Sequence, residues 1–433
     1  MLGIPEQVTI RGGQPLDGSV HAPPSKSHTH RALIAASLSP EKSWIHNPSL
    51  CEDVQATVQA VEAYGAEVIF ENGPLIVSGV DHIRLPNNVV DCRESGSTMR
   101  FVTPILAHAE GISVVTGEAS LRRRPMQPLI DSLRQLGVEC YSARKDGRPP
   151  LVLFGGTYKG GKVRIVGDIS SQFISGLLFS GSIAGEPTSI EVTPVLESAP
   201  YVGMTIKVLK CHGIQIDANV DMTRFSIDGG QTPSSYDHVI EGDYSSAAFL
   251  LAAGAITGSE VGVFGLPTER SSQGDSEVVS LLRGMRADVH ADGGTVRVRS
   301  SRLRGMKIDA SDCPDLVPPL AVVACCAEGT TKIVNAQRLR MKESNRLKAL
   351  SSELSKMGAK ICDTDDGFEI VGRSLLKGAT VNSHGDHRVA MSCAVAALAA
   401  KGETILDGAG CVAKSYPSFF DDLKTLGGDI SGR

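Results

Sequence analysis

A segment that recurs six times along the 433 residues constrains the fold more than any other feature. In each repeat, an aliphatic residue is followed four positions later by a glycine and then by a short predicted strand. The pairs are Val61 and Gly65, Leu133 and Gly137, Leu209 and Gly213, Leu282 and Arg286, Leu354 and Gly358, and Leu423 and Gly427. Glycine suits the left-handed position that ends a helix, and Arg286 departs from this rule. A period of roughly 70 residues predicts globular subdomains rather than solenoid rungs.

A second marker recurs with the same period, because each repeat also contains a polar turn that leads into an apolar helix of small residues. The turns lie at 25–27, 94–97, 168–172, 242–246, 312–315 and 385–388. A helix that is apolar on nearly all sides is buried, so we expect six buried helices that begin at six polar turns. If the helices run parallel, their positively polarised starts face one cleft and attract anions.

The ends of the chain predict how the repeats close. The sixth repeat stops before its second strand, whereas a spare strand at 7–11 precedes the first repeat, so we expect this strand to complete the last unit. The segment 229–238 is the clearest linker, with Pro233, Ser234 and Ser235 together. We therefore predict an α/β (α+β) chain with two domains of three units each. The first domain spans 22–239, the second spans 1–21 and 240–433, and the chain crosses near 21 and 239.

The composition excludes several classes of function. A net charge of −5 argues against a general nucleic-acid-binding protein. Ten cysteines without a C-x-x-C pair indicate reduced thiols and a cytoplasmic protein. Apolar runs fall short of the ~18 residues of a membrane span, and the N-terminus has no signal-peptide pattern. We expect no membrane or nucleic-acid partner.

Common cofactor and metal motifs are missing from the sequence. There is no phosphate-binding G-x-x-x-x-G-K-[ST] loop and no dinucleotide-binding G-x-G-x-x-G after a strand. His28 with His30, and His384 with His387, supply too few ligands for a metal site. We therefore expect neither a metal nor a cofactor.

The first polar turn has the composition of an anion site. Pro23 and Pro24 precede Ser25, Lys26 and Ser27, and Arg31 follows one helical turn later. Hydroxyl, ammonium, guanidinium and free helix-start amides together suit a phosphate or a carboxylate. A capped helix with two solvated cations is the alternative interpretation.

Further cationic stretches lie along the chain. One is the arginine run that ends in Arg124 before a proline, and the densest is 338–346, where we expect Lys342 and Arg346 on one helix face with Glu343 beside them. An ion-paired surface helix is the alternative there. Asp315 stands at a helix start, as a cap or as a base that accepts a hydroxyl proton. Arg388 and Lys414 complete the cationic set.

Nine of these segments, in order along the whole chain, resemble one family. They are Pro24-Ser25-Lys26-Ser27-x-x-x-Arg31, Gly96-Ser97-Thr98-Met99-Arg100, Arg124-Pro125, Ser170-Ser171-Gln172-Phe173, Glu241-Gly242-Asp243, Pro314-Asp315, Lys342-Glu343-Ser344-x-Arg346, Asp386-His387-Arg388 and Cys411-x-x-Lys414. The chain thus resembles the 5-enolpyruvylshikimate-3-phosphate (EPSP) synthases, or 3-phosphoshikimate 1-carboxyvinyltransferases. The resemblance implies two domains, each of three βαβαββ units with buried helices and outer mixed sheets, and an inter-domain cleft.

The resemblance also implies a reaction. A transferase of this family moves the enolpyruvyl group of phosphoenolpyruvate to the 5-hydroxyl of shikimate 3-phosphate and releases phosphate, by addition and then elimination. The step belongs to the shikimate pathway, towards chorismate and the aromatic amino acids. We expect a cytoplasmic monomer without a cofactor. Four anionic groups must meet during this reaction, and only many cations and helix starts could hold them in a closed cleft.

The family motifs assign roles to residues of this chain. The implied ligands of shikimate 3-phosphate are Lys26, Ser27, Arg31, Ser170, Ser171, Gln172, Ser198, Tyr201, Asp315 and Lys342. The implied ligands of phosphoenolpyruvate are Lys26, Gly96, Arg124, Gln172, Arg346, Arg388 and Lys414. Asp315 would accept the proton of the 5-hydroxyl. Glu343 or Lys26 would give a proton to the methylene carbon and later remove one, and the sequence leaves that choice open.

Three positions depart from the family pattern. Glu94 replaces a usual asparagine and brings a negative charge towards the phosphoenolpyruvate pocket, Ser97 replaces threonine, and Arg338 replaces an asparagine that contacts shikimate 3-phosphate. Gly96 leaves room for glyphosate, an inhibitor of this family at the phosphoenolpyruvate site, whereas the charge of Glu94 bears on its binding.

Three other classes of protein fit the sequence less well. UDP-N-acetylglucosamine enolpyruvyl transferases share the fold and the donor, but they carry a reactive cysteine in the loop that here spans 119–123 without one. RNA 3′-phosphate cyclases share the repeat but need a basic RNA surface. A non-catalytic anion-binding module would need neither Asp315 nor Glu343.

Overall fold

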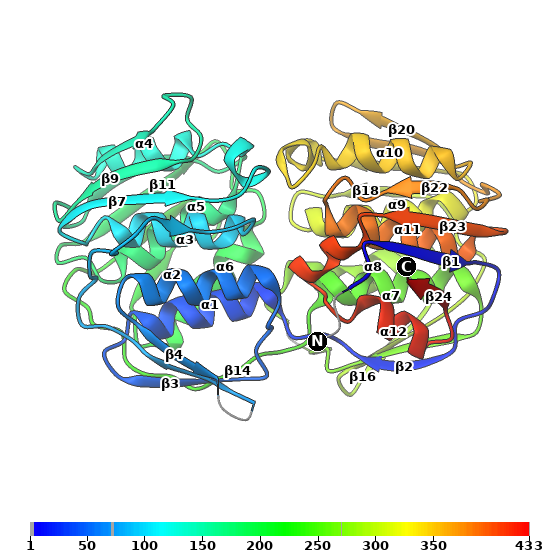
Figure 1. Ribbon diagram of the computed structural model, residues 1–433, viewed down its shortest axis with the longest axis horizontal. Coiled ribbons are helices and arrows are strands. Elements are labelled where there is room, and N and C mark those ends of the chain that lie inside the picture. The colour runs from blue at the N-terminus through cyan, green and yellow to red at the C-terminus, as the bar shows by residue number, and fades with distance from the viewer. Residues whose placement is uncertain (1–3, 71–72, 270, 433) are drawn as a thin grey trace. The chain divides into compact units, whose positions relative to one another are not determined.

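The computed structural model describes residues 4–70, 73–269 and 271–432. The chain divides into two compact units, which we call the first unit (Pro24–Ile240) and the second unit (Met1–Pro23 with Glu241–Arg433). In each unit the helices lie together and the strands lie outside them (Figure 1). Each unit has its own hydrophobic core.

The strands of the described residues form six four-stranded sheets with one common order. In each sheet the first two strands are parallel and the other neighbours are antiparallel. The sheets of the first unit are β14 (His238–Val239), β3 (Lys42–His46), β5 (Leu75–Ser78), β4 (Glu67–Phe70); β6 (Val90–Asp91), β7 (Gly111–Thr116), β9 (Leu151–Gly155), β8 (Glu139–Ser142); and β10 (Gly161–Val166), β11 (Thr188–Thr193), β13 (Arg224–Ile227), β12 (Ile216–Ala218). This common order confirms the predicted repeat and fold class.

The second unit repeats the pattern three times. Its sheets are β2 (Gly18–His21), β15 (Glu260–Phe264), β17 (Thr295–Arg299), β16 (Asp288–Asp292); β18 (Lys307–Asp309), β19 (Thr330–Val334), β21 (Gly367–Val371), β20 (Lys360–Thr364); and β22 (Thr380–Asn382), β23 (Glu403–Asp407), β1 (Gln7–Arg11), β24 (Asp429–Gly432). Strand β1 lies between β23 and β24, so the N-terminal strand completes the sixth sheet as predicted.

Two short strands near the crossings do not pair with the repeat that follows them in the chain. Strand β2 precedes the first repeat in sequence, yet it pairs with β15 of the second unit. Strand β14 precedes the fourth repeat, yet it pairs with β3 of the first unit. Each crossing segment therefore supplies a sheet strand to the unit that it leaves.

The helices fall into two sets. The buried set is α1 (Lys26–Ser37), α3 (Gly96–Leu106), α5 (Ser171–Gly181), α7 (Tyr244–Thr257), α9 (Val317–Cys326) and α11 (His387–Ala399). The outer set is α2 (Glu52–Ala63), α4 (Gln127–Gln135), α6 (Ala199–Cys211), α8 (Val278–Gly284), α10 (Arg346–Lys356) and α12 (Phe419–Thr425). Short 3₁₀ turns are η1 (Leu121–Arg123), η2 (Gly274–Glu277), η3 (Pro314–Leu316), η4 (Gln337–Met341) and η5 (Ala409–Lys414).

The buried helices begin at the predicted polar turns. In five of them the N-cap side chain accepts a hydrogen bond from an amide of the first turn, and these caps are Ser25, Ser95, Ser170, Asp243 and Asp386. Helix α9 instead follows directly from η3, which contains Asp315. Each cap satisfies an amide that would otherwise lack a partner inside the protein.

Each outer helix ends at a residue in the left-handed region. Five of these residues are glycines with φ between +81° and +112°, namely Gly65, Gly137, Gly213, Gly358 and Gly427. Arg286 occupies the same position after α8 with φ +66°. The fourth repeat thus keeps the backbone conformation although it lacks the glycine that favours it.

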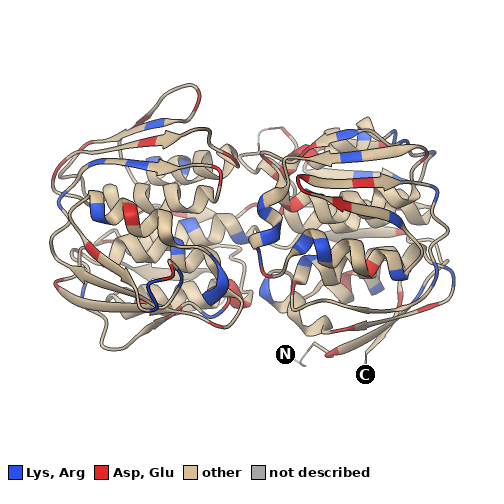
Figure 2. Cartoon of the chain, turned by 90° about the horizontal axis from the view of Figure 1, so that it is seen from above, with Lys and Arg blue, Asp and Glu red and all other residues tan. Residues whose placement is uncertain are grey.

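Charged residues of both signs are spread over the helices, strands and loops of the chain (Figure 2). Several form ion pairs between residues directly opposite each other on neighbouring strands, such as Arg164 with Glu191 and Arg299 with Glu260. Exposed pairs of this kind contribute less than about 1 kcal/mol each. Within the described residues, none of the helices combines the length and the apolar character that crossing a membrane requires.

Candidate functional site

The starts of several helices lie together in the first unit. His30 of α1 contacts Thr57 of α2 at 2.7 Å, and Thr57 contacts Thr98 of α3 at 2.6 Å. Arg100 of α3 donates to Gln172 of α5 at 2.6 Å. These contacts join α1, α2, α3 and α5 within one unit, and the positive pole of a helix start suits an anion.

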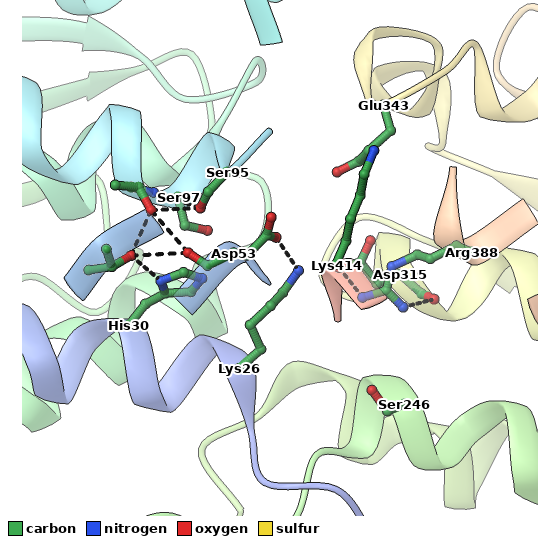
Figure 3. A network of polar contacts seen from close by, with 12 residues as sticks. Lys26, His30, Asp53, Ser95, Ser97, Ser246, Asp315, Glu343, Arg388 and Lys414 are labelled. Atoms are coloured by element: carbon green, nitrogen blue, oxygen red, sulfur yellow. Dashed lines mark hydrogen bonds and ion pairs between the residues drawn. The ribbon is translucent and has the colours of Figure 1, made fainter. Parts of the chain in front are cut away.

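Lys26 opens α1 and forms an ion pair with Asp53. Its Nζ lies 2.7 Å from Asp53 Oδ2, on the first turn of α2 (Figure 3). Both side chains are largely buried. The sequence reasoning missed Asp53, because an acidic residue in the first turn of a helix is common and marks no particular partner.

Arg31 holds two other predicted residues in place. It donates to the backbone oxygens of Ser27 at 2.9 Å and Tyr201 at 3.0 Å, and to Thr205 Oγ1 at 2.8 Å. Its guanidinium also lies over the rings of Phe101 and Tyr201. Burial lowers the pKa of Arg31 to about 10. Arg31 thus connects α1 to the start of α6, where Tyr201 lies.

Gln172 and Ser198 lie at the starts of α5 and α6. Gln172 donates to Ser97 Oγ at 2.8 Å, and its own amide N–H donates to Ser170 Oγ at 3.4 Å. Ser198 precedes α6 in a left-handed conformation, with φ +57° and ψ +40°. A serine in this region costs of order 1 kcal/mol, and such strain clusters at functional sites.

Gly96 allows two guanidiniums to approach the start of α3. A Cβ atom there would lie 2.7 Å from Arg124 Nη1 and 2.9 Å from Arg100 Nη1. Arg124 is buried and directly follows η1. Two arginines beside a helix start favour a phosphate or a carboxylate.

Glu94 contacts the loop that precedes η1. Its carboxylate accepts hydrogen bonds from the backbone amide of Ser120, at 3.3 Å, and from the Ser120 hydroxyl. The carboxylate that departs from the family pattern therefore accepts two hydrogen bonds from Ser120.

Arg346 is the centre of a buried charge network in the second unit. Its guanidinium donates to Asp386 at 3.0 and 3.2 Å, to Glu343 at 2.6 Å and to Asp315 at 3.2 Å. Burial lowers the pKa of Arg346, but Asp386, Glu343 and Asp315 outweigh this effect and raise it above its ordinary value. Arg346 therefore stays charged although only 1% of its side chain is exposed.

Asp315 lies between two guanidiniums. Arg346 Nη1 lies 3.2 Å from its Oδ1. Arg388 Nη2 lies 3.0 Å from its Oδ2 (Figure 3). Burial raises the pKa of Asp315, but the charges of Arg388, Lys342 and Arg346 hold it well below its ordinary value. In this state Asp315 is an ionised carboxylate and a weak base.

The predicted helix face shared by Lys342 and Arg346 is wrong. Lys342 follows η4 in an extended conformation, and α10 begins at Arg346 because Asn345 caps it by accepting the amide N–H of Lys348. Both cations nevertheless act on Asp315. Desolvation lowers the pKa of Lys342 to about 8, although the charge of Asp315 opposes this shift.

Three further residues support the network. Asp386 is completely buried, caps α11, and accepts hydrogen bonds from Ser344, Arg346 and the amide of Arg388. Arg338 donates to the backbone oxygens of Ala310 and Ser311, a few residues before Asp315. Lys414 donates to the backbone oxygen of Gly385 at 3.0 Å. The sequence reasoning gave Asp386 no role, although its position as N-cap of an apolar helix was a usable signal.

The predicted residues divide by their position in the chain into two groups, one in each unit. The group in the first unit is Lys26, Ser27, Arg31, Gly96, Arg124, Ser170, Ser171, Gln172, Ser198 and Tyr201, and the group in the second unit is Asp315, Lys342, Glu343, Arg346, Arg388 and Lys414. Among the described residues, no three or more His, Cys, Asp or Glu side chains are arranged to hold a metal ion. The two groups offer cations, helix starts and two carboxylates that can exchange protons.

Comparisons with known proteins agree on one family. The family model for EPSP synthase (3-phosphoshikimate 1-carboxyvinyltransferase) matches residues 10–423. A 3-phosphoshikimate 1-carboxyvinyltransferase of Methanocella arvoryzae is 46% identical over 95% of this chain and 97% of that protein. The corresponding protein of Methanocaldococcus jannaschii is 41% identical over 96% of this chain and 97% of its own.

A solved structure supports the same assignment. The EPSP synthase of Acinetobacter baumannii is 28% identical, with a TM-score of 0.81 over 98% of this chain and 99% of that one. The match of the family model over nearly the whole length and these full-length relatives show that the chain belongs to the EPSP synthase family of enzymes, the 3-phosphoshikimate 1-carboxyvinyltransferases.

Proposed function

We propose that the chain transfers the enolpyruvyl group of phosphoenolpyruvate to the 5-hydroxyl of shikimate 3-phosphate and releases phosphate. The observation that supports this most directly is the position of Asp315 between Arg346 and Arg388. A carboxylate can accept a hydroxyl proton, and two guanidiniums beside it can bind the carboxylate of the donor. An acid–base residue and an anion site thus occupy one place in the fold.

In our proposal the first unit mainly holds the acceptor. Lys26, Ser27, Arg31, Ser170, Ser171, Gln172, Ser198 and Tyr201 bind shikimate 3-phosphate, together with Asp315 and Lys342 of the second unit. Hydroxyl groups and helix-start amides suit its phosphate and its ring hydroxyls. Arg31 contributes by fixing Ser27 and Tyr201.

The proposed ligands of phosphoenolpyruvate, the donor, come from the second unit and from the part of the first unit near α3. Arg346 and Arg388 bind the carboxylate of phosphoenolpyruvate, and Lys26, Gly96, Arg124, Gln172 and Lys414 bind its phosphate side. The missing side chain at Gly96 brings Arg124 close to the amides of α3. Glyphosate carries both a carboxylate and a phosphonate, so we propose that it competes for the same residues.

The chemistry needs two proton transfers in the addition and one at C3 in the elimination. In the addition, the O–H bond of the 5-hydroxyl breaks, its proton goes to Asp315, and the oxygen bonds to C2 of phosphoenolpyruvate while C3 gains a proton. In the elimination, C3 loses a proton and the bond from C2 to the phosphate oxygen breaks. Glu343 or Lys26 gives the proton to C3 in the addition and removes one from it in the elimination. Glu343 accepts from Arg346, and Lys26 donates to Asp53.

The proposed ligands of each substrate come from both units, so both units must act on the same two molecules. We propose that the first unit is the shikimate 3-phosphate side, that the second is the phosphoenolpyruvate and catalytic side, and that substrates draw them together in a cytoplasmic monomer. Small-angle scattering with and without both substrates tests this closure. An unchanged radius of gyration would contradict it.

A phosphate-release assay tests the function itself. With phosphoenolpyruvate as donor, we expect phosphate only when shikimate 3-phosphate is the acceptor, and none with UDP-N-acetylglucosamine. Release of phosphate with the nucleotide sugar would contradict the proposal and indicate a UDP-N-acetylglucosamine enolpyruvyl transferase. Release with neither acceptor would refute enolpyruvyl transfer to either one.

A further inference from the structure

The carboxylate of Asp315 occupies the face that two arginines share. One oxygen accepts from Arg346 Nη1 at 3.2 Å and the other from Arg388 Nη2 at 3.0 Å. Arg388 Nη1 also lies 3.3 Å from the backbone oxygen of Asp315. A carboxylate bridged by two guanidiniums is the arrangement in which we propose the donor's own carboxylate to bind.

The guanidinium of Arg346 does not depend on Asp315 for its position, and the backbone of Arg388 is held by the cap of α11. Asp386 holds Arg346 through two hydrogen bonds and also accepts the amide N–H of Arg388, while Glu343 takes another donor of Arg346. Only 1% of the Arg346 side chain and 7% of the Arg388 side chain are exposed. The guanidinium of Arg346 is therefore held independently of Asp315, and the Asp315 carboxylate bridges it to the guanidinium of Arg388.

We propose that Asp315 is an intramolecular competitor of the donor substrate: the carboxylate of phosphoenolpyruvate displaces it from Arg346 and Arg388 and thereby frees it to act as the base. This inference rests on the proposed function and adds an order to it. The base becomes active only after the donor has entered, so the acceptor hydroxyl is not deprotonated in the donor's absence.

The charges around Asp315 explain why displacement would activate it. Arg388 on α11, Arg346 on α10 and Lys342 before α10 face it as cations, and Glu343 faces it as a carboxylate. Together the cations outweigh burial and keep the pKa of Asp315 low. A ligand carboxylate on the two arginines would neutralise part of this positive charge, and the pKa of Asp315 would then rise towards its ordinary value.

The test compares two anions on the Asp315→Asn variant by titration calorimetry, without acceptor. The probes are phosphoenolpyruvate, which carries the carboxylate, and inorganic phosphate, which does not. We expect the variant to bind phosphoenolpyruvate roughly tenfold more tightly than the unsubstituted protein, the order of one charge-assisted hydrogen bond, with unchanged affinity for phosphate. Turnover should fall in the same variant, because the base is gone.

Glu343→Gln is the matched control, because it removes a carboxylate from the other side of Arg346, where Asp386 remains. Its ratio of the two affinities should stay at the value of the unsubstituted protein. An equal gain for both anions in Asp315→Asn, or no gain for phosphoenolpyruvate, would overturn the competition. Asp315→Ala provides a second variant if the amide disturbs folding. The phosphate-release assay on the unsubstituted protein separates this outcome from failure of the proposed function.

Discussion

Arg346 and Asp386 are joined by two hydrogen bonds, from Nε to Oδ2 at 3.0 Å and from Nη2 to Oδ1 at 3.2 Å. The residues lie 40 positions apart, at the first residue of α10 and at the N-cap of α11. Their side chains are 1% and 0% exposed. The pair therefore ties two helix starts together and orients the guanidinium that reaches Asp315.

We expect Asp386→Asn to lower the free energy of unfolding by about 3 kcal/mol, because a buried guanidinium would lose its main ionised partner. Asparagine can still cap α11, so the loss reports the ion pair rather than the cap. Urea denaturation followed by circular dichroism measures the change.

Asp421→Asn is the control for this substitution. Asp421 pairs with Lys424 at 3.7 Å on the surface, with both side chains well exposed. Its replacement should cost less than about 1 kcal/mol. Equal losses in the two variants would show that Asp386 contributes no more than a surface carboxylate.

Arg124→Ala should raise the KM for phosphoenolpyruvate by about 10- to 100-fold, the range expected for the loss of hydrogen bonds to a charged group. The affinity for shikimate 3-phosphate should change little. Arg123→Ala is the matched control, because Arg123 is the adjacent arginine and is exposed. Steady-state kinetics with each substrate varied in turn measures both. An unchanged KM in Arg124→Ala would remove Arg124 from the donor site.

Much of the fold was predictable because its signals are local. A serine or aspartate before an apolar run marks a helix start, and the polar turns at 25–27, 94–97 and 385–388 contain the caps Ser25, Ser95 and Asp386. The position of the strand at 7–11 in the sixth sheet was predictable because the last repeat lacked one strand. The partner strands of β2 and β14 within the sheets were not predicted, since the partner of a short strand depends on tertiary packing.

The sequence located the charged residues of the candidate site but did not predict which of them form ion pairs. The motifs named Lys26, Asp315, Arg346 and Arg388, yet nothing in the sequence shows which carboxylate meets which cation across 27 to 73 positions. Lys342 and Arg346 do not share a helix face, because Asn345 caps α10 and the helix begins after it. From the sequence alone, an asparagine can either continue a helix or cap one. Local pattern therefore located the charges, and packing decided their partners.

The pKa of Lys342 predicts a pH dependence. Desolvation lowers this pKa from 10.5 to about 8, so the ammonium loses its proton as the pH rises through that value. If the charged form binds shikimate 3-phosphate, kcat/KM for this substrate should fall above pH 8, by up to tenfold per pH unit, because kcat/KM reports groups of the free enzyme. Steady-state kinetics between pH 6.5 and 9.5 measures this limb.

Lys342→Arg identifies the group responsible. An arginine keeps its charge throughout this range, so the fall above pH 8 should disappear even if the guanidinium binds less well. A limb that persists unchanged in Lys342→Arg would assign the titration to another residue.

Arg286→Gly should stabilise the protein by up to about 1 kcal/mol, because Arg286 holds φ +66° where the other five outer helices end in glycine. The side chain is exposed, so its removal opens no cavity. Part of the gain is offset by the greater freedom of glycine in the unfolded chain. Arg286→Ala is the control: it removes the same side chain but keeps a Cβ in the left-handed region, so it should give no gain. Urea denaturation of both variants decides the matter. A gain in both would place the effect in the arginine side chain and not in the backbone that all six repeats share.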